Sequence, residues 1–151
     1  NRIVTEHPPD RVLALPESSW GAGGGHFTWL NADTQFMWPK INEAEVRMER
    51  LVASSTGAIG AEREFLNQAA RELLLLESSD WPFLVTTGQA REYAVERFED
   101  HLSRFHQLAE IIELGTTEEP QSVAFLRDLQ DRDNPFPAID YRDFRAHQGS
   151  V

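Results

Sequence analysis

The chain has 151 residues, contains no cysteine and carries a formal net charge of -11, from 25 acidic and 14 basic residues. Without cysteine it forms neither disulfides nor thiolate metal sites, and its acidity disfavours nucleic acid and anionic membrane surfaces as partners. No apolar run approaches the roughly 20 residues that span a bilayer.

Residues 1–41 are rich in glycine, proline and tryptophan and show no helical period. Residues 11–15 have the pattern of a short strand or a buried extended segment, which Pro16 ends. Four glycines among residues 21–25 exclude a regular element there. We therefore predict a loop-rich first segment and minimal strand content.

Residues 42–131 show the spacing of apolar side chains that is typical of helices. A first helix is expected from about Asn42, where Glu45 three residues later fits a capping box. A second helix is expected over residues 61–77, with an apolar stripe wide enough for burial on more than one side.

The third helix has the clearest period, and we place its capping box at Thr86 and Gln89 and its end at Gly115. A fourth, shorter helix is expected from Thr117, with Pro120 in its first turn. The predicted fold class is therefore all-α, a bundle of about four helices. Residues 132–151 follow as an extended tail whose aromatic side chains pack on the helices.

All four tryptophans fall at positions that we predict to be loops: Trp20, Trp29, Trp38 and Trp81. An indole offers a flat apolar face and one N–H group, which suits the apolar C–H face and polar rim of a sugar ring. Carboxylates lie nearby in the sequence at Glu17, Asp33 and Asp80. The pattern indicates carbohydrate binding, and plain packing of loop aromatics is the other interpretation.

Other candidate chemistries are weaker. The glycine-rich run is followed by neither a helical pattern nor a Lys-Ser/Thr pair, so it does not fit a nucleotide site. His101 and His106 are five residues apart, which does not favour a shared helix face, and we interpret the histidines as surface or hydrogen-bonded residues rather than metal ligands. No carboxylate pair stands out for glycosidase chemistry.

Several sequence motifs resemble the α-1,4-glucan branching enzymes of glycoside hydrolase family 57. The first of them covers the glycine-rich loop, and the resemblance extends over nearly the whole chain. The matching stretches are LPESSWG at residues 15–21, GGH at 24–26, WLN at 29–31, Trp38 with EAE at 43–45, SSDWPF at 78–83 and NPFPAIDYR at 134–142.

The resemblance implies that this chain is the helical C-terminal domain of a cytoplasmic enzyme, packed against an incomplete (β/α) barrel of the same polypeptide. Branching enzymes of the family cleave an α-1,4-glucan and transfer the fragment to a 6-hydroxyl. They work by retaining double displacement with a Glu nucleophile and an Asp acid/base, without metal or other cofactor. Both catalytic residues lie on the barrel, so no catalytic residue is assigned here and the chain alone is expected to be inactive.

The resemblance also implies substrate-binding residues. Two tryptophans nine residues apart line the acceptor side of the family's active-site cleft, and Trp20 and Trp29 have that spacing. Asp80 and Trp81 match the family's last conserved region. We expect residues 1–41 to line the glucan cleft, with residues 42–131 as the bundle.

Two alternatives stay open. The chain could be the same domain of a family 57 α-amylase, because a helical domain does not separate transfer from hydrolysis. It could also be a stand-alone, non-catalytic helical binding module. Because its first residue is Asn1 rather than Met, we expect the last part of a larger enzyme.

Overall fold

The computed structural model describes residue 14, residues 19–21 and residues 25–146. Every regular element within these residues is a helix, which confirms the all-α prediction. The short strand or extended segment expected over residues 11–15 lies outside the described residues except for Ala14, which is in no regular element. The elements are α2 (Met37–Ser54), α3 (Gly60–Leu76), α4 (Asp80–Thr87), α5 (Arg91–Leu114), α6 (Pro120–Arg132) and the 3-10 helix η2 (Tyr141–Phe144).

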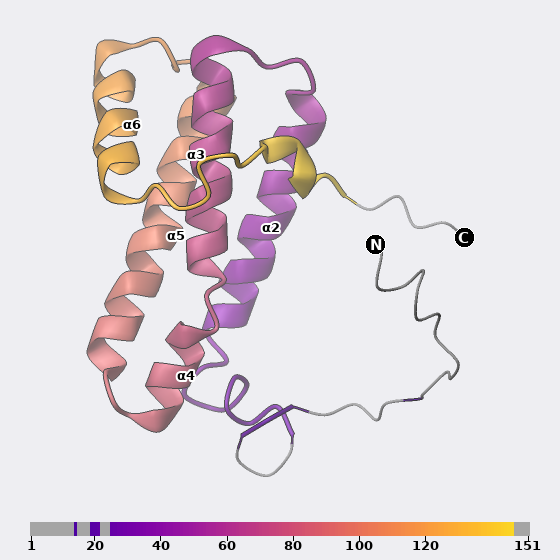
Figure 1. The fold of residues 1–151 in the computed structure, drawn as a ribbon, viewed down its shortest axis with the longest axis vertical. Coiled ribbons are helices and arrows are strands. Elements are labelled where there is room, and N and C mark those ends of the chain that lie inside the picture. Colours follow the sequence, from indigo (N-terminus) through magenta and orange to yellow (C-terminus); the bar gives the residue numbers. More distant parts are fainter. Residues whose placement is uncertain (1–13, 15–18, 22–24, 147–151) are drawn as a thin grey trace, which may run out of the picture.

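The helix α3 lies at the centre of the bundle, between α2 on one side and α5 behind it (Figure 1). The short α4 closes one end by packing on α5, and α6 packs beside α3 at the other end. The segment after α6 crosses α3 and brings η2 against α2 and α3. None of the helices in this described part is long and apolar enough to cross a membrane.

The core forms where the apolar stripes of α3 and α5 meet. Phe65, Phe98 and Phe105 are fully buried. On α3 the buried positions extend around most of the helix from Phe65 to Leu73, because α2, α5 and the C-terminal segment all cover it. This confirms the prediction, made from the wide apolar stripe, that this helix is buried on more than one side.

The C-terminal segment packs on the bundle through Tyr141, which is buried. Its hydroxyl donates to the carbonyl of Ser55, and its backbone N–H donates to Asn67 Oδ1 at 3.0 Å. Tail packing by this aromatic is confirmed. For Phe136 the prediction is wrong, because its side chain is 58% exposed and its backbone has a φ of 54°.

The first helix begins at Met37, five residues before the predicted start, and Asn42 is an exposed residue inside it. The reason is a turn upstream, in which the carbonyl of Asn31 accepts from the N–H groups of Thr34 and Gln35. The turn leads directly into α2, so the predicted capping box at Asn42 is wrong. Trp38 consequently lies in a helix.

The helix α4 was not predicted, and it contains both Trp81 and Thr86. Thr86 therefore caps nothing, and α5 begins at Arg91 without a side-chain cap. The end of α5 at Gly115, which has a φ of 68°, is confirmed. The helix α6 begins at Pro120 rather than Thr117, because proline occupies its first helical position.

Candidate functional site

The turn-rich segment before α2 is held together by hydrogen bonds to its own backbone. The buried Thr34 hydroxyl donates to the carbonyl of Trp29 at 2.8 Å and accepts from the N–H of Asn31 at 3.0 Å. The indole N–H of Trp38 donates to the same Trp29 carbonyl at 3.2 Å. These bonds fix the backbone that carries the Trp29 ring.

Asn31 fastens this segment to α4. Its side-chain amide donates to the carbonyl of Phe27 and to Thr86 Oγ1, both at 2.8 Å. Its Oδ1 accepts from the N–H of Asp33 at 2.8 Å. Thr86 in turn donates to the carbonyl of Thr28 at 2.8 Å. One amide and one hydroxyl thus connect two parts of the chain that are 55 residues apart in sequence.

Trp20 and Trp29, which the sequence predicts to act together, are in contact. Their rings meet edge to face with centroids 5.4 Å apart, and Phe83 of α4 lies 5.9 Å from Trp20. Trp20 nevertheless remains 70% exposed. Gly21 makes this approach possible, because it has a φ of 115° and a Cβ there would lie 2.3 Å from Thr28 Oγ1.

A groove of about 670 Å³ opens beside these rings. Its lining is mostly aromatic, which favours an apolar ring face over an ion. The lining residues are Ser19, Trp20, His26, Trp29, Leu30 and Trp38. Trp38 belonged to the predicted carbohydrate-binding pattern but not to the substrate-binding residues that the resemblance implied. It follows Trp29 by nine residues, as Trp29 follows Trp20, and that repeat was the available signal.

The candidate carboxylates do not gather at this groove. Asp33 pairs with Arg91 at 3.0 Å, and the hydrogen bond from that guanidinium lowers the pKa of Asp33. Asp80 is exposed in the first turn of α4. Glu17 lies outside the described residues.

Trp81 faces a different side of α4. Its indole N–H donates to the carbonyl of Leu75 at 2.7 Å, and its ring stacks on His101 with centroids 6.2 Å apart. Tyr93 meets it edge to face at 6.4 Å. Side chains two positions apart on a helix point about 200° apart, and Phe83 is the one that contacts Trp20. Trp81 is therefore separated from the Trp20–Trp29 groove by α4.

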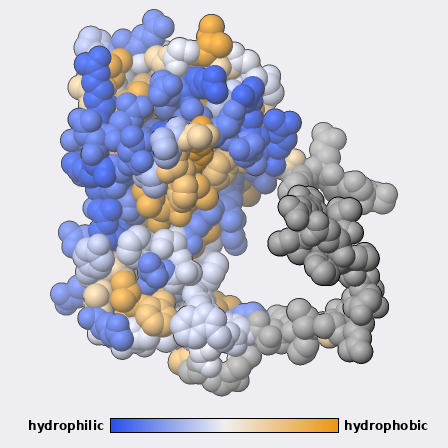
Figure 2. Space-filling model, viewed as in Figure 1, coloured by the Kyte–Doolittle hydropathy of each residue, from blue (hydrophilic) through white to orange (hydrophobic). Residues whose placement is uncertain are grey.

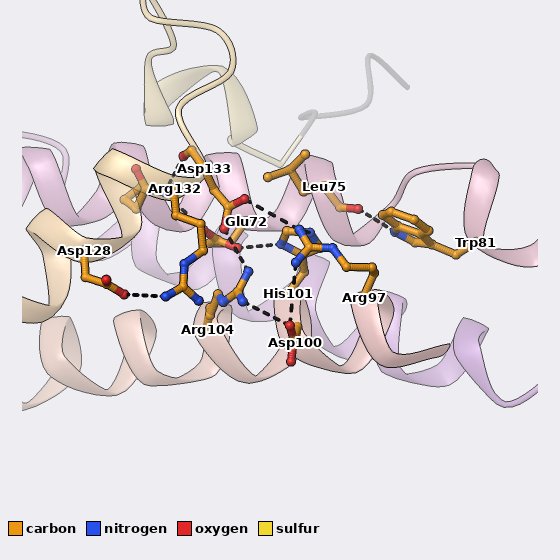
Figure 3. Close-up of polar contacts among 11 residues, drawn as sticks. Glu72, Leu75, Trp81, Arg97, Asp100, His101, Arg104, Asp128, Arg132 and Asp133 are labelled. Carbon is orange, nitrogen blue, oxygen red and sulfur yellow. Dashed lines mark hydrogen bonds and ion pairs between the residues drawn. The ribbon is translucent and has the colours of Figure 1, made fainter. Parts of the chain in front are cut away.

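A buried polar cluster lies between α3 and α5, beside Trp81 (Figure 3). His101 Nδ1 and Glu72 Oε2 are 2.8 Å apart, and Arg104 pairs with Asp133 at 2.8 Å. One ligand-type atom each of Glu72, His101 and Asp133 lies within 4.8 Å of the others. A metal ion there would meet the guanidinium groups of Arg97 and Arg104, so we interpret the cluster as a structural bracket.

The cluster bears out the interpretation of His101 as a hydrogen-bonded residue. Sequence reasoning missed its partners, because Glu72 and Asp133 lie 29 and 32 residues away and show no motif spacing. Across the described residues, every buried side-chain nitrogen and oxygen has a hydrogen-bond partner.

Residues 40–144 match the sequence model of one family, described as "1,4-alpha-glucan branching enzyme, C-terminal". The chain is 45% identical over 140 residues to the 1,4-alpha-glucan branching enzyme of Thermococcus kodakarensis. It is 28% identical over 136 residues to a probable 1,4-alpha-glucan branching enzyme of Mycobacterium tuberculosis. These matches cover 92% and 86% of this chain but only 21% and 26% of the relatives.

Solved structures give the same likeness. A family 57 branching enzyme from Thermococcus kodakarensis, crystallised in complex with glucose and additives, superposes with a TM-score of 0.86 at 39% identity. The corresponding enzyme of Pyrococcus horikoshii gives 0.85 at 39% identity. In both cases 97% of this chain is covered, against 27% and 28% of the solved chains. These likenesses to branching enzymes do not favour the α-amylase or the stand-alone module.

Proposed function

Because the chain belongs to the family of 1,4-alpha-glucan branching enzyme C-terminal domains, we propose that it is the substrate-binding domain of a longer branching enzyme. That enzyme would cut an α-1,4-glucan and join the fragment through an α-1,6 bond by retaining transfer. The barrel that precedes the domain in the family would carry the catalytic Glu and Asp. This chain would contribute binding surface and no catalytic residue.

The Trp20–Trp29 pair beside the groove, with Trp20 exposed and Trp29 half-buried, is the observation that carries the proposal. Leaving an indole in water is unfavourable relative to covering it with an apolar surface. Hydrogen bonds of Asn31 and Thr34 and the backbone conformation of Gly21 hold the pair in place. A glucan is neutral, so the net charge of -11 does not oppose it. Its apolar ring faces would cover the indoles and its hydroxyls would remain hydrated.

In the longer enzyme, the groove would form one wall of the cleft in which the glucan fragment is transferred. Covering the fragment on this side would exclude water and favour transfer to a sugar hydroxyl over hydrolysis. We propose a division into a cleft-lining segment (residues 1–41), a helical bundle (42–131) and a tail (132–151). The family resemblance also supports a cytoplasmic location and a reaction without cofactor.

The first test replaces Trp20 and Trp29 singly with alanine in the longer enzyme. Losing one stacking ring should lower the branching of amylose about tenfold, measured by the loss of iodine staining. The melting temperature of the Trp20→Ala variant should hardly change, because that ring is mostly exposed. Phe27→Ala is the matched control, since Phe27 lies in the same segment and is 57% exposed but does not line the groove.

Wild-type turnover in both tryptophan variants would contradict the proposal. A large fall in the melting temperature of Trp20→Ala would indicate that the ring serves packing instead. The isolated 151-residue chain should not branch amylose, and activity in that sample would refute the assignment of catalysis to the barrel.

A further inference from the structure

We propose that the α5 surface next to α4 is a second α-glucan-binding surface, separate from the Trp20–Trp29 groove. It consists of Tyr93, Trp81, Arg97 and Asp100, and we call it the α5 surface. The inference rests on the proposed function, because that function supplies the glucan. It also gives the Trp81 region, which α4 separates from the groove, a binding role of its own.

An aromatic platform forms one end of the α5 surface. The Tyr93 side chain is 54% exposed and its ring rests against Trp81. Trp81 is held on two sides, by the carbonyl of Leu75 and by the ring of His101. Tyr93 therefore has a fixed support, and an exposed ring on a fixed support binds a sugar face with little loss of conformational entropy.

Hydrogen-bonding groups continue from this platform along one face of α5. Tyr93, Arg97 and Asp100 are spaced i, i+4 and i+7, so their side chains follow one another along the helix. The Arg97 guanidinium lies 3.6 Å from both Asp100 and Asp133, and its Nη2 lies 3.0 Å from His101 Nε2 (Figure 3). These contacts hold the guanidinium in place.

Both polar groups remain accessible. The side chains of Arg97 and Asp100 are 26% and 44% exposed. A guanidinium has five donor positions and a carboxylate about four acceptor positions, so both retain capacity for sugar hydroxyls beyond their mutual contacts. Arg97 and Asp100 lie about one and about two helical turns from Tyr93. The Tyr93 ring could cover the apolar face of a glucan unit while the two polar groups bind hydroxyls on its rim.

The charge balance selects a neutral ligand. Asp100 and Asp133 pair with Arg97 and Arg104, so the charges along this stripe are matched. The chain as a whole carries -11, and a phosphate or carboxylate ligand would be repelled without gaining an unpaired cation here. A neutral polyol is not subject to that repulsion.

The test measures amylose binding and turnover by the longer enzyme with Tyr93→Ala and Tyr93→Phe. In native gels containing amylose, Tyr93→Ala should be retarded less than the wild type, corresponding to a roughly three- to tenfold weaker affinity for amylose. Its KM for amylose should rise by a similar factor, while kcat should fall less than twofold. Tyr93→Phe should keep the wild-type affinity, because the ring is retained. Phe136→Ala removes a comparably exposed ring from the tail and is the matched control.

Equal retardation of Tyr93→Ala and the wild type would overturn the inference, as would equal losses in Phe136→Ala and Tyr93→Ala. A fall in kcat as large as the rise in KM would also overturn it, because the residue would then act at the transfer cleft. The proposed function would survive these outcomes if Trp20→Ala still lowered branching. It would fail separately if the Trp20 and Trp29 variants were fully active.

Discussion

The core of the bundle and the segment that precedes the bundle use aromatic residues in opposite ways. In the bundle Phe65, Phe98 and Phe105 are fully buried between α3 and α5. In the preceding segment Trp20 is 70% exposed, and order comes from polar bonds at Thr34 and Asn31. Burial stabilises the first region, whereas the second holds an apolar surface open.

This difference separates stability from binding. A buried ring contributes free energy through the area it removes from water, so its loss destabilises the fold. An exposed ring held by polar bonds contributes little to folding and is available to a ligand. Substitutions in the two regions should therefore affect different measurements.

The largest expected effect is on stability, from Phe98→Ala in α5. Removing a fully buried ring loses its transfer free energy and leaves a cavity, which should lower the free energy of unfolding by about 3–5 kcal/mol. Urea denaturation of the chain, followed by circular dichroism, measures this. Phe27→Ala in the preceding segment should change it by less than about 0.5 kcal/mol, and equal losses in both variants would remove the distinction.

A smaller and local effect is expected from Asn31→Ala. The substitution leaves the bonds to the Phe27 carbonyl, Thr86 and the Asp33 N–H unmade, which should cost about 1–3 kcal/mol within the segment. Hydrogen exchange should speed up over residues 27–36 while the amides of α3 and α5 stay protected.

Gln35→Ala is the matched control for Asn31→Ala. Gln35 also carries an amide in this segment but is exposed and makes only a long 3.4 Å bond to the Ala32 carbonyl. If Asn31→Ala instead weakened protection throughout α5, the segment and the bundle would unfold as one cooperative unit.

The long helices could be predicted from the sequence because their apolar period is sustained. The helix α5 extends over 24 residues and α3 over 17, so many positions support each prediction. The helix α4 has only eight residues, and Trp81 and Pro82 directly follow its first residue, Asp80. So short a stretch shows no helical period of apolar residues. Its existence depends on packing against α5.

The candidate site was predictable only in part, for a similar reason. The nine-residue spacing of Trp20 and Trp29 is visible in the sequence, but the bond from Asn31 to Thr86 joins residues 55 positions apart. Which side of α4 Trp81 faces depends on a helix that the sequence did not reveal. Local spacing therefore predicted the aromatic pair. That Trp81 lies at the α5 surface and not at the groove could be seen only in the folded structure.

The carboxylate of Glu77 differs from those that pair with arginines, because burial governs its titration. Glu77, just after α3, is half-buried in a groove of about 380 Å³ between α2, α3 and η2. Val46, Met48, Leu73 and Phe144 supply apolar walls, and Glu45 is also in the lining. Figure 2 shows hydrophobic surface gathered over the adjoining half of α3. Burial, with a smaller contribution from Glu45, raises the pKa of Glu77 to about 7.

The smallest expected effect therefore depends on pH, in the variant Glu77→Gln. Because the folded-state pKa is raised above the unfolded value, the wild type is favoured below about pH 4.5 and loses that contribution as the pH rises through about 7. A fully buried group with this shift would lose about 3 kcal/mol, and solvent screening at a half-buried one reduces the expected loss to about 1 kcal/mol. Glutamine carries no charge at any pH, so the variant should match the wild type at pH 4 and exceed it at pH 8. Urea denaturation at both values measures the difference, and a gap that does not widen with pH would mean that the groove leaves Glu77 fully hydrated.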